Sequence, residues 1–158
     1  MRVIGIDPGT GIVGFGIIDV KTVHERTLVD AGVITTPVNT PLPERLVTIQ
    51  ENIIELLDEF NPEAMVIEQL FFAQNVTTAM GVAHARGVIL AEAQKRGLEI
   101  IERTPLQIKQ TLTGYGKADK KQMQEMVKII LKLQAIPKPD DCADALAAAL
   151  CYIPNLNK

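Results

Sequence analysis

Two short apolar segments of this chain each end in an acidic residue, and this pattern constrains the fold and the chemistry together. Asp7 ends RVIGID and Glu68 ends AMVIE, and both segments have the length and apolar character of a buried strand. A carboxylate at the edge of a core is costly unless it is paired or protonated. For several such acids in one protein, a divalent cation is the simplest common partner.

A second pair of acids lies near the C-terminus, in DDCADALAAAL, where the pattern predicts a helix over 140–152. Asp141 and Asp144 are three residues apart, so their Cβ atoms would lie about 5–6 Å apart on one helix face. Two carboxylates at that distance can share a cation or its bound waters. The alternative for Asp140 and Asp141 is stabilisation by the helix dipole in the first turn. That alternative explains Asp144 poorly.

Carboxylates in three separate segments are typical of a magnesium site. Mg²⁺ prefers oxygen ligands and is usually held by a few carboxylates together with substrate phosphate oxygens. Two such ions about 3.5–4 Å apart can activate a water and stabilise the leaving oxygen of a phosphodiester. We therefore expect metal-dependent phosphodiester hydrolysis. Taken singly, each acid has a plainer interpretation as a helix cap, a turn former or a solvated charge.

Length and composition indicate one globular domain. A chain of 158 residues can bury a substantial core without disulfides. Asp7 interrupts the first apolar run, which is then too short for a signal peptide, and no segment approaches the roughly 20 apolar residues of a membrane span. We expect a cytoplasmic protein without a membrane partner. Cys142 and Cys151 fall in one predicted helix, about 13 Å apart, which excludes a disulfide between them.

Charge is distributed unevenly along the chain. The formal net charge is −3, which argues against indiscriminate binding to nucleic acid. Residues 41–68 hold seven acidic residues and one basic residue, whereas residues 103–138 hold eight basic and two acidic residues. The second region is therefore expected to attract phosphate and the first to repel it.

The predicted elements begin with a meander and continue with strands and helices in alternation. Residues 2–7, 13–20 and 27–36 are predicted to form three antiparallel strands. The pattern then predicts a helix over 43–60, a strand over 64–68, a helix over about 75–96, a strand over 98–103, and helices over 105–112, 119 to about 133, and 140–152. The helix over 75–96 is rich in Ala and Gly, which favours close packing on the sheet or a homodimer contact.

The segment GIDPGTGIVGFGIID places a tight turn directly after Asp7. Pro8, Gly9 and Gly11 let a phosphate or a metal ion approach the backbone closely. A similar strand and turn occur in actin-like ATPases, where the turn holds nucleotide phosphates. This motif alone therefore does not distinguish a nuclease from a kinase.

Taken together, the motifs resemble the RuvC-type Holliday junction resolvases, which are ribonuclease H-like nucleases. The matching segments, in family order, are GIDPGT with GFGIID, IEQLFFAQN, ARGV, QIKQTLTGYGKADKKQM and ADALAAAL. The resemblance implies an α/β, ribonuclease H-like fold with a mixed five-stranded sheet flanked by helices. It also implies one nuclease domain over 1–153, a short tail over 154–158, and a homodimer that makes Mg²⁺-dependent nicks in two opposing strands of a four-way DNA junction.

The resemblance assigns roles to individual residues. Two Mg²⁺ ions, for which Mn²⁺ is a possible substitute, would be bound by Asp7, Glu68, Asp141 and Asp144. The doubled acid leaves open whether Asp140 or Asp141 is the closer ligand. Lys109 and Lys120 would hold or polarise the scissile phosphate. Phe71 would stack on bases at the junction, although Phe72 could serve instead and either could belong to the core. The expected contacts with DNA comprise Phe71, Phe72, Asn75, Lys117 and Lys121.

Three other functions remain as alternatives to junction cleavage. A related ribonuclease H-like RNA-processing nuclease would cleave RNA in preference to junctions. An actin-like ATP-dependent kinase would need a second phosphate-binding Gly motif, for which the chain has neither the length nor the sequence. An inert junction-binding protein would bind without turnover, and the complete set of acids and lysines disfavours it. The family resemblance also suggests the branch-migration proteins RuvA and RuvB as partners.

Overall fold

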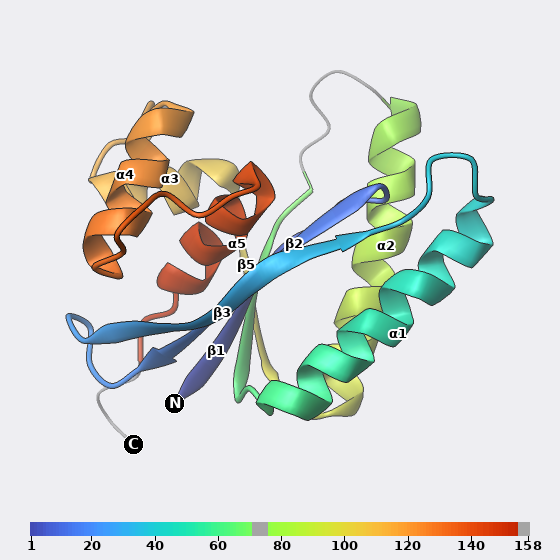
Figure 1. Cartoon of the computed structure of the whole chain (residues 1–158), viewed down its shortest axis with the longest axis horizontal. Helices are drawn as coiled ribbons and strands as arrows, with labels where there is room; N and C mark the ends of the chain where they lie inside the picture. The colour runs from blue at the N-terminus through green and yellow to red at the C-terminus, as the bar shows by residue number, and fades with distance from the viewer. Residues whose placement is uncertain (71–75, 155–158) are drawn as a thin grey trace.

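The computed structural model describes residues 1–70 and 76–154 and contains a mixed five-stranded sheet. Strands β1 (Arg2–Asp7), β2 (Ile12–Val20) and β3 (Arg26–Thr35) form the expected antiparallel meander. Strands β4 (Ala64–Glu68) and β5 (Glu99–Arg103) add in parallel on the other side of β1, which gives the order β3-β2-β1-β4-β5. The α/β fold class and the mixed sheet are therefore confirmed (Figure 1).

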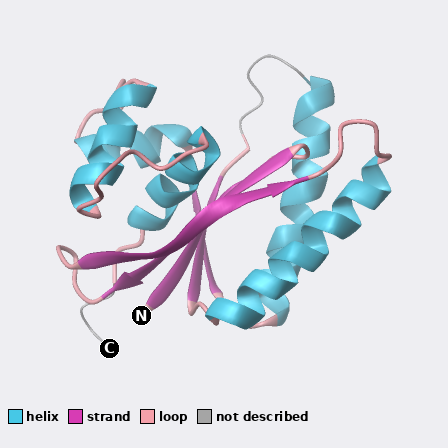
Figure 2. Cartoon of the chain, in the orientation of Figure 1, coloured by secondary structure: helices cyan, strands magenta, loops and turns pink. Residues whose placement is uncertain are grey.

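Helices cover both faces of this sheet (Figure 2). Helices α1 (Leu42–Phe60) and α2 (Val76–Lys95) lie on one face, and α3 (Pro105–Thr113), α4 (Lys120–Ile130) and α5 (Asp140–Leu150) lie on the other. Each face has its own apolar core, because successive strand side chains point to opposite sides. Val3 of β1 belongs to the core beneath α5, whereas Ile4 and Ile6 belong to the core beneath α1 and α2.

Two helices end earlier than the sequence indicates, since α5 stops at Leu150 and not at residue 152, and α4 is also shorter than expected. Helix α4 was expected to reach about Leu133, but it ends at Ile130. Lys132 adopts a left-handed backbone with φ 54°, and the amide of Leu133 donates to the carbonyl of Lys128 at 2.9 Å. This bond, with that from Lys132 to Ile129, forms a Schellman ending, a motif that glycine usually marks. No glycine stands here, so the pattern gave no signal for the end of the helix.

The cysteines and the helix hydropathy can be compared directly with the structure. Cys142 in α5 and Cys151 directly after it are both buried and both free, as their predicted separation requires. Among the helices that the structure describes, none has both the length and the apolar character needed to cross a bilayer.

Candidate active site

The acids that end β1 and β4 lie side by side on one face of the sheet. Ile6 and Ile67 are partners in the parallel β1–β4 register, and both belong to the core beneath α1 and α2. Because side chains alternate between the two faces, the next residues, Asp7 and Glu68, face the opposite side, on which α5 lies. Alternation along two neighbouring strands therefore aims both carboxylates at α5.

Two glycines allow α5 to lie directly on this face. A Cβ added at Gly14 would collide with the carbonyl oxygen of Asp141, and one added at Gly5 would collide with that of Ala145. Helix α5 thus approaches the backbone of β1 and β2 at a distance that any larger residue would prevent. Gly5 and Gly14 both lie in the motif around Asp7, but no role was predicted for either of them.

The pKa of Asp7 is raised in part by the charges of the other acids. It is raised from 3.8 to about 7, chiefly because the carboxyl group is buried. The charges of Glu68, Asp144 and Asp141 raise it further, in that order, and the ammonium of Lys120 lowers it. Acids from β1, β4 and α5 therefore form one electrostatic group around Asp7.

The pKa values of Glu68 and Asp144 are raised, as that of Asp7 is. Burial raises the pKa of Glu68 to about 6, with a further rise from Asp144 and an opposing effect from Lys109. Burial also raises the pKa of Asp144, and Lys120 opposes that shift. Asp7, Glu68 and Asp144 are thus harder to ionise than usual, and a nearby lysine lowers the pKa of each one in part.

Both predicted lysines reach this cluster. A cavity of about 220 Å³ is lined by Glu68, Asp144, Lys109 and Lys120, together with apolar side chains from α3, α4 and α5. The ammonium of Lys120 lies 3.5 Å from a carboxylate oxygen of Asp144. Capping boxes begin α3 and α4, at Thr104 and at Asp119, so the helices that carry these lysines have fixed starts.

The doubled acid at 140 and 141 divides its contacts. Asp140 lies 3.1 Å from the ammonium of Lys120 and accepts a hydrogen bond from Gln124 at 3.1 Å. The pKa of Asp140 is lowered, mainly by its bond with Lys120. Asp141, in contrast, is among the charges that raise the pKa of Asp7. Asp141 therefore belongs to the carboxylate cluster, whereas Asp140 pairs with the lysine.

The chemistry of the donors fits a divalent cation. All four acids offer hard carboxylate oxygens. Burial, together with the charges of neighbouring acids, raises the pKa values of Asp7, Glu68 and Asp144, and a bound cation would oppose both effects. Over residues 1–70 and 76–154, no three Asp, Glu, His or Cys side chains stand close enough together to ligate one ion. The carboxylates are therefore close enough to repel one another, but no three of them in the described residues converge closely enough to bind the same ion.

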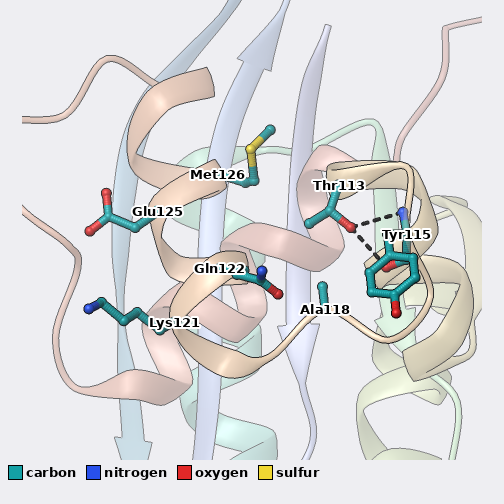
Figure 3. A pocket seen from close by; sticks show the side chains of 7 residues that line it. All are labelled: Thr113, Tyr115, Ala118, Lys121, Gln122, Glu125 and Met126. Carbon is teal, nitrogen blue, oxygen red and sulfur yellow. Dashed lines mark hydrogen bonds between the residues drawn. The ribbon is translucent and has the colours of Figure 1, made fainter.

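The residues expected to contact DNA are only partly described. Phe71, Phe72 and Asn75 lie outside the described residues. Lys117 is exposed in the loop between α3 and α4. Lys121, although next to Lys120 in the chain, lines a different cavity of about 400 Å³ between that loop and α4 (Figure 3). There the Thr113 hydroxyl bonds to both backbone polar groups of Tyr115, which fixes the loop.

Comparison with known proteins identifies the family. The family model for "Crossover junction endodeoxyribonuclease RuvC" matches residues 3–152. The chain is 51% identical to the protein of that name from Alkaliphilus oremlandii over 152 residues, which cover 96% of this chain and 92% of the relative. It is 50% identical to the one from Finegoldia magna, with 97% and 93% covered.

Solved structures agree with this assignment. The structure described as T. thermophilus RuvC in complex with Holliday junction substrate has a TM-score of 0.90 and 38% identity, over 96% of this chain and 92% of that one. The yeast mitochondrial Holliday junction resolvase shares the fold, with a TM-score of 0.69 at 15% identity over 94% of this chain and 76% of that one. The chain therefore belongs to the RuvC family of crossover junction endodeoxyribonucleases, divalent-metal nucleases that resolve Holliday junctions.

Proposed function

We propose that this RuvC-family chain cleaves its junction with two Mg²⁺ ions bound by Asp7, Glu68, Asp141 and Asp144, and that Mn²⁺ can replace them. The observation that carries this proposal is the placement of the acids, because Asp7 and Glu68 end neighbouring strands on the face of the sheet where α5 lies in close contact. The charges of Glu68, Asp141 and Asp144, together with burial, raise the pKa of Asp7 to about 7, which supports this placement. When bound, a pair of divalent ions supplies an activated water and stabilises the leaving oxygen of the phosphodiester.

The two lysines would hold the scissile phosphate. Lys109 and Lys120 line the same cavity as Glu68 and Asp144. A phosphate that enters this cavity would meet two ammonium donors beside the carboxylates, so that charge developing on its oxygens is stabilised. Asp140, paired with Lys120, would keep that ammonium at the edge of the acidic cluster.

Lysines outside the cavity would guide the DNA. Lys117 and Lys121 extend the positive charge of the α3–α4 region beyond the active site. Contacts of this type bind phosphates without reading sequence, and they allow a protein of net charge −3 to bind DNA through one local surface. We propose Phe71, Phe72 and Asn75 as further contacts at the junction, within one nuclease domain over 1–153.

A homodimer would place two active sites on one junction. Helix α2 carries exposed small residues one turn apart at Ala83, Gly87 and Ala91, and a Cβ added at Gly87 would meet nothing. Such a surface lets another helix approach closely, and a two-fold axis there would suit paired nicks in opposing strands. The family resemblance makes RuvA and RuvB proposed partners of this dimer.

Cleavage of a labelled four-way junction tests the proposal. Wild type, Asp7→Asn and Asp30→Asn would each be incubated with an end-labelled junction or a linear duplex of the same sequence, in Mg²⁺ or in EDTA. We expect paired symmetric nicks only in the junction and only with Mg²⁺. They should be lost in Asp7→Asn and kept in Asp30→Asn, whose carboxylate lies on exposed β3.

Binding measured on the same substrates separates the alternatives. Asp7→Asn should still bind the junction, because removing an acid relieves repulsion of phosphate. Normal nicking by Asp7→Asn would refute the metal assignment. Tight junction binding without cleavage by wild type would favour an inert binder, and preferential cleavage of RNA would favour an RNA-processing nuclease.

A further inference from the structure

We propose that Arg86 of α2 is a positioning residue for the active site, because its guanidinium holds the backbone of Glu68. The Nε atom of Arg86 donates to the carbonyl oxygen of Glu68 at 3.2 Å. Its Nη2 atom is paired with the carboxylate of Glu102 on β5. The Arg86 side chain therefore binds both β4 and β5 close to their C-terminal ends. This inference rests on the proposed role of Glu68 as a metal ligand.

The place of Glu68 in the sheet explains why an extra anchor matters. On the β1 side, the parallel register with β4 ends at Ile67, one residue before Glu68. On the β5 side, Glu68 is the last residue in register, opposite Arg103. The last hydrogen bond between the two strands runs from the amide of Gln69 to the carbonyl of Arg103, at 2.7 Å, and beyond it the chain leaves the sheet. Arg86 thus holds the carbonyl of Glu68 at the point where the ladder of strand hydrogen bonds stops.

Burial and charge indicate that this effect is geometric. The Arg86 side chain is only 16% exposed, and its charge is balanced by Glu102. The charged groups that shift the pKa of the Glu68 carboxyl are Asp144 and Lys109. Arg86 therefore acts through the backbone of Glu68. By fixing this backbone, it helps to hold the Glu68 carboxylate in position against repulsion from the neighbouring acids.

The fork of a guanidinium suits this task in a way that an ammonium does not. Arg86 directs one N–H at a backbone carbonyl and another at a carboxylate on the next strand, in a fixed planar geometry. A lysine keeps the charge but has a single nitrogen and cannot reproduce both directed contacts. Groups that orient a metal ligand typically change metal affinity or activity by about 10–100-fold when they are removed.

The experiment compares Arg86→Lys with Arg96→Lys as a matched control. Arg96, directly after α2, is also a partly buried arginine that binds two carboxylates. One belongs to Glu92 of α2 and the other to Asp58 of α1, so its contacts lie away from the acidic cluster. Three quantities are measured for each protein. They are the rise in melting temperature as Mg²⁺ is added without DNA, the cleavage rate as a function of Mg²⁺ concentration, and junction affinity in EDTA.

For Arg86→Lys we expect the Mg²⁺ concentration at half effect to rise by about tenfold in both the thermal and the cleavage titrations. Junction affinity in EDTA should be unchanged. Arg96→Lys should lose stability without a change in either Mg²⁺ midpoint. Glu102→Gln provides a milder variant that keeps the Arg86 contact with Glu68 and weakens the other contact, and it should shift both midpoints in the same direction by a smaller factor.

The outcomes separate this inference from the proposed function. Wild-type Mg²⁺ midpoints in Arg86→Lys, or equal shifts in Arg96→Lys, would overturn the positioning role. If Arg86→Lys does not fold, wild-type midpoints in Glu102→Gln would overturn it. A wild-type protein that neither gains stability from Mg²⁺ nor cleaves the junction would instead defeat the proposed metal site itself.

Discussion

Asp7 is a single residue of the candidate site whose buried carboxylate lowers the stability of the fold when it is ionised. Its pKa in the folded protein is raised to about 7, above the ordinary value of 3.8. The folded state therefore binds this proton more tightly than the unfolded state does. The resulting stability is fully present below about pH 3.8 and is lost as the pH rises through about 7. The carboxyl of Glu68, with a pKa of about 6, acts in the same direction.

We therefore expect metal-free protein to become less stable between about pH 5 and about pH 8, and Asp7→Asn to remove much of this loss. At the upper pH the variant should gain on the order of 2 kcal/mol in the free energy of unfolding. Thermal melts in EDTA at both pH values measure the effect, with Asp30→Asn as the control. Equal pH dependence in wild type and Asp7→Asn would contradict a mutually repelling cluster.

Lys120 and Lys121 are neighbours in the chain with different surroundings. Lys120 lines the cavity of the acidic cluster, whereas Lys121 lines the cavity shown in Figure 3. Lys120→Ala should reduce the cleavage rate at saturating junction by about 100-fold, because it removes a donor to the transition-state phosphate. Lys121→Ala should instead weaken binding and lower its salt slope by about one.

Cleavage at saturating DNA and binding at several salt concentrations distinguish these two effects. A pure affinity loss in Lys120→Ala would make this residue a docking contact. A rate loss at saturation in Lys121→Ala would show that the cavity of Figure 3 extends the active site.

At the scale of elements, the contact of α5 with the sheet sets the geometry of the cluster. A methyl group at Gly14 would collide with the Asp141 backbone, so Gly14→Ala must move α5 away from β2. We expect a loss of about 1–3 kcal/mol in stability, as for other overpacked sites, and a larger relative loss of cleavage. Gly32→Ala is the control and should keep cleavage, because a Cβ there would collide with the ring of Phe15 and not with α5. Melting temperature and junction cleavage measure both effects, and wild-type cleavage by Gly14→Ala would show that α5 tolerates displacement.

The same elements show what could be predicted from the sequence. Strand ends at Asp7 and Glu68 were predicted correctly because apolar runs of strand length stop there, and alternation then fixes the face. The end of α4 at Ile130 was not predicted, because Lys132 adopts the left-handed conformation without a glycine to mark it. Arg86 received no individual role, because its partners, the Glu68 carbonyl and Glu102, are brought together only by the fold.

At the scale of the whole molecule, the two faces of the sheet differ in charge as well as in packing. Helix α1 carries several exposed acids, and it lies on the opposite face of the sheet from α3, α4 and α5 (Figure 1). The lysines of the 103–138 region lie with α3 and α4, beside the acids of the cluster. Because the acids of α1 would repel phosphate, we expect the charge distribution to orient a junction toward the face that carries the proposed active site.

Paired cleavage then depends on how two copies are arranged, which the exposed small residues of α2 make testable. Ala83→Glu places a charged side chain in the proposed dimer surface and should yield a monomer, measured by light scattering after size-exclusion chromatography. Val47→Glu, at an exposed apolar position on α1, is the control and should remain dimeric.

A supercoiled plasmid with an extruded cruciform provides the functional readout for the same variants. A dimer that cuts both strands within one encounter linearises the plasmid, whereas a monomer releases it after one nick as an open circle. We expect linear product from wild type and Val47→Glu, and open circle from Ala83→Glu. Linear product from a monomeric Ala83→Glu would show that two active sites need not be joined through α2, and a dimeric Ala83→Glu would place the subunit contact elsewhere on the molecule.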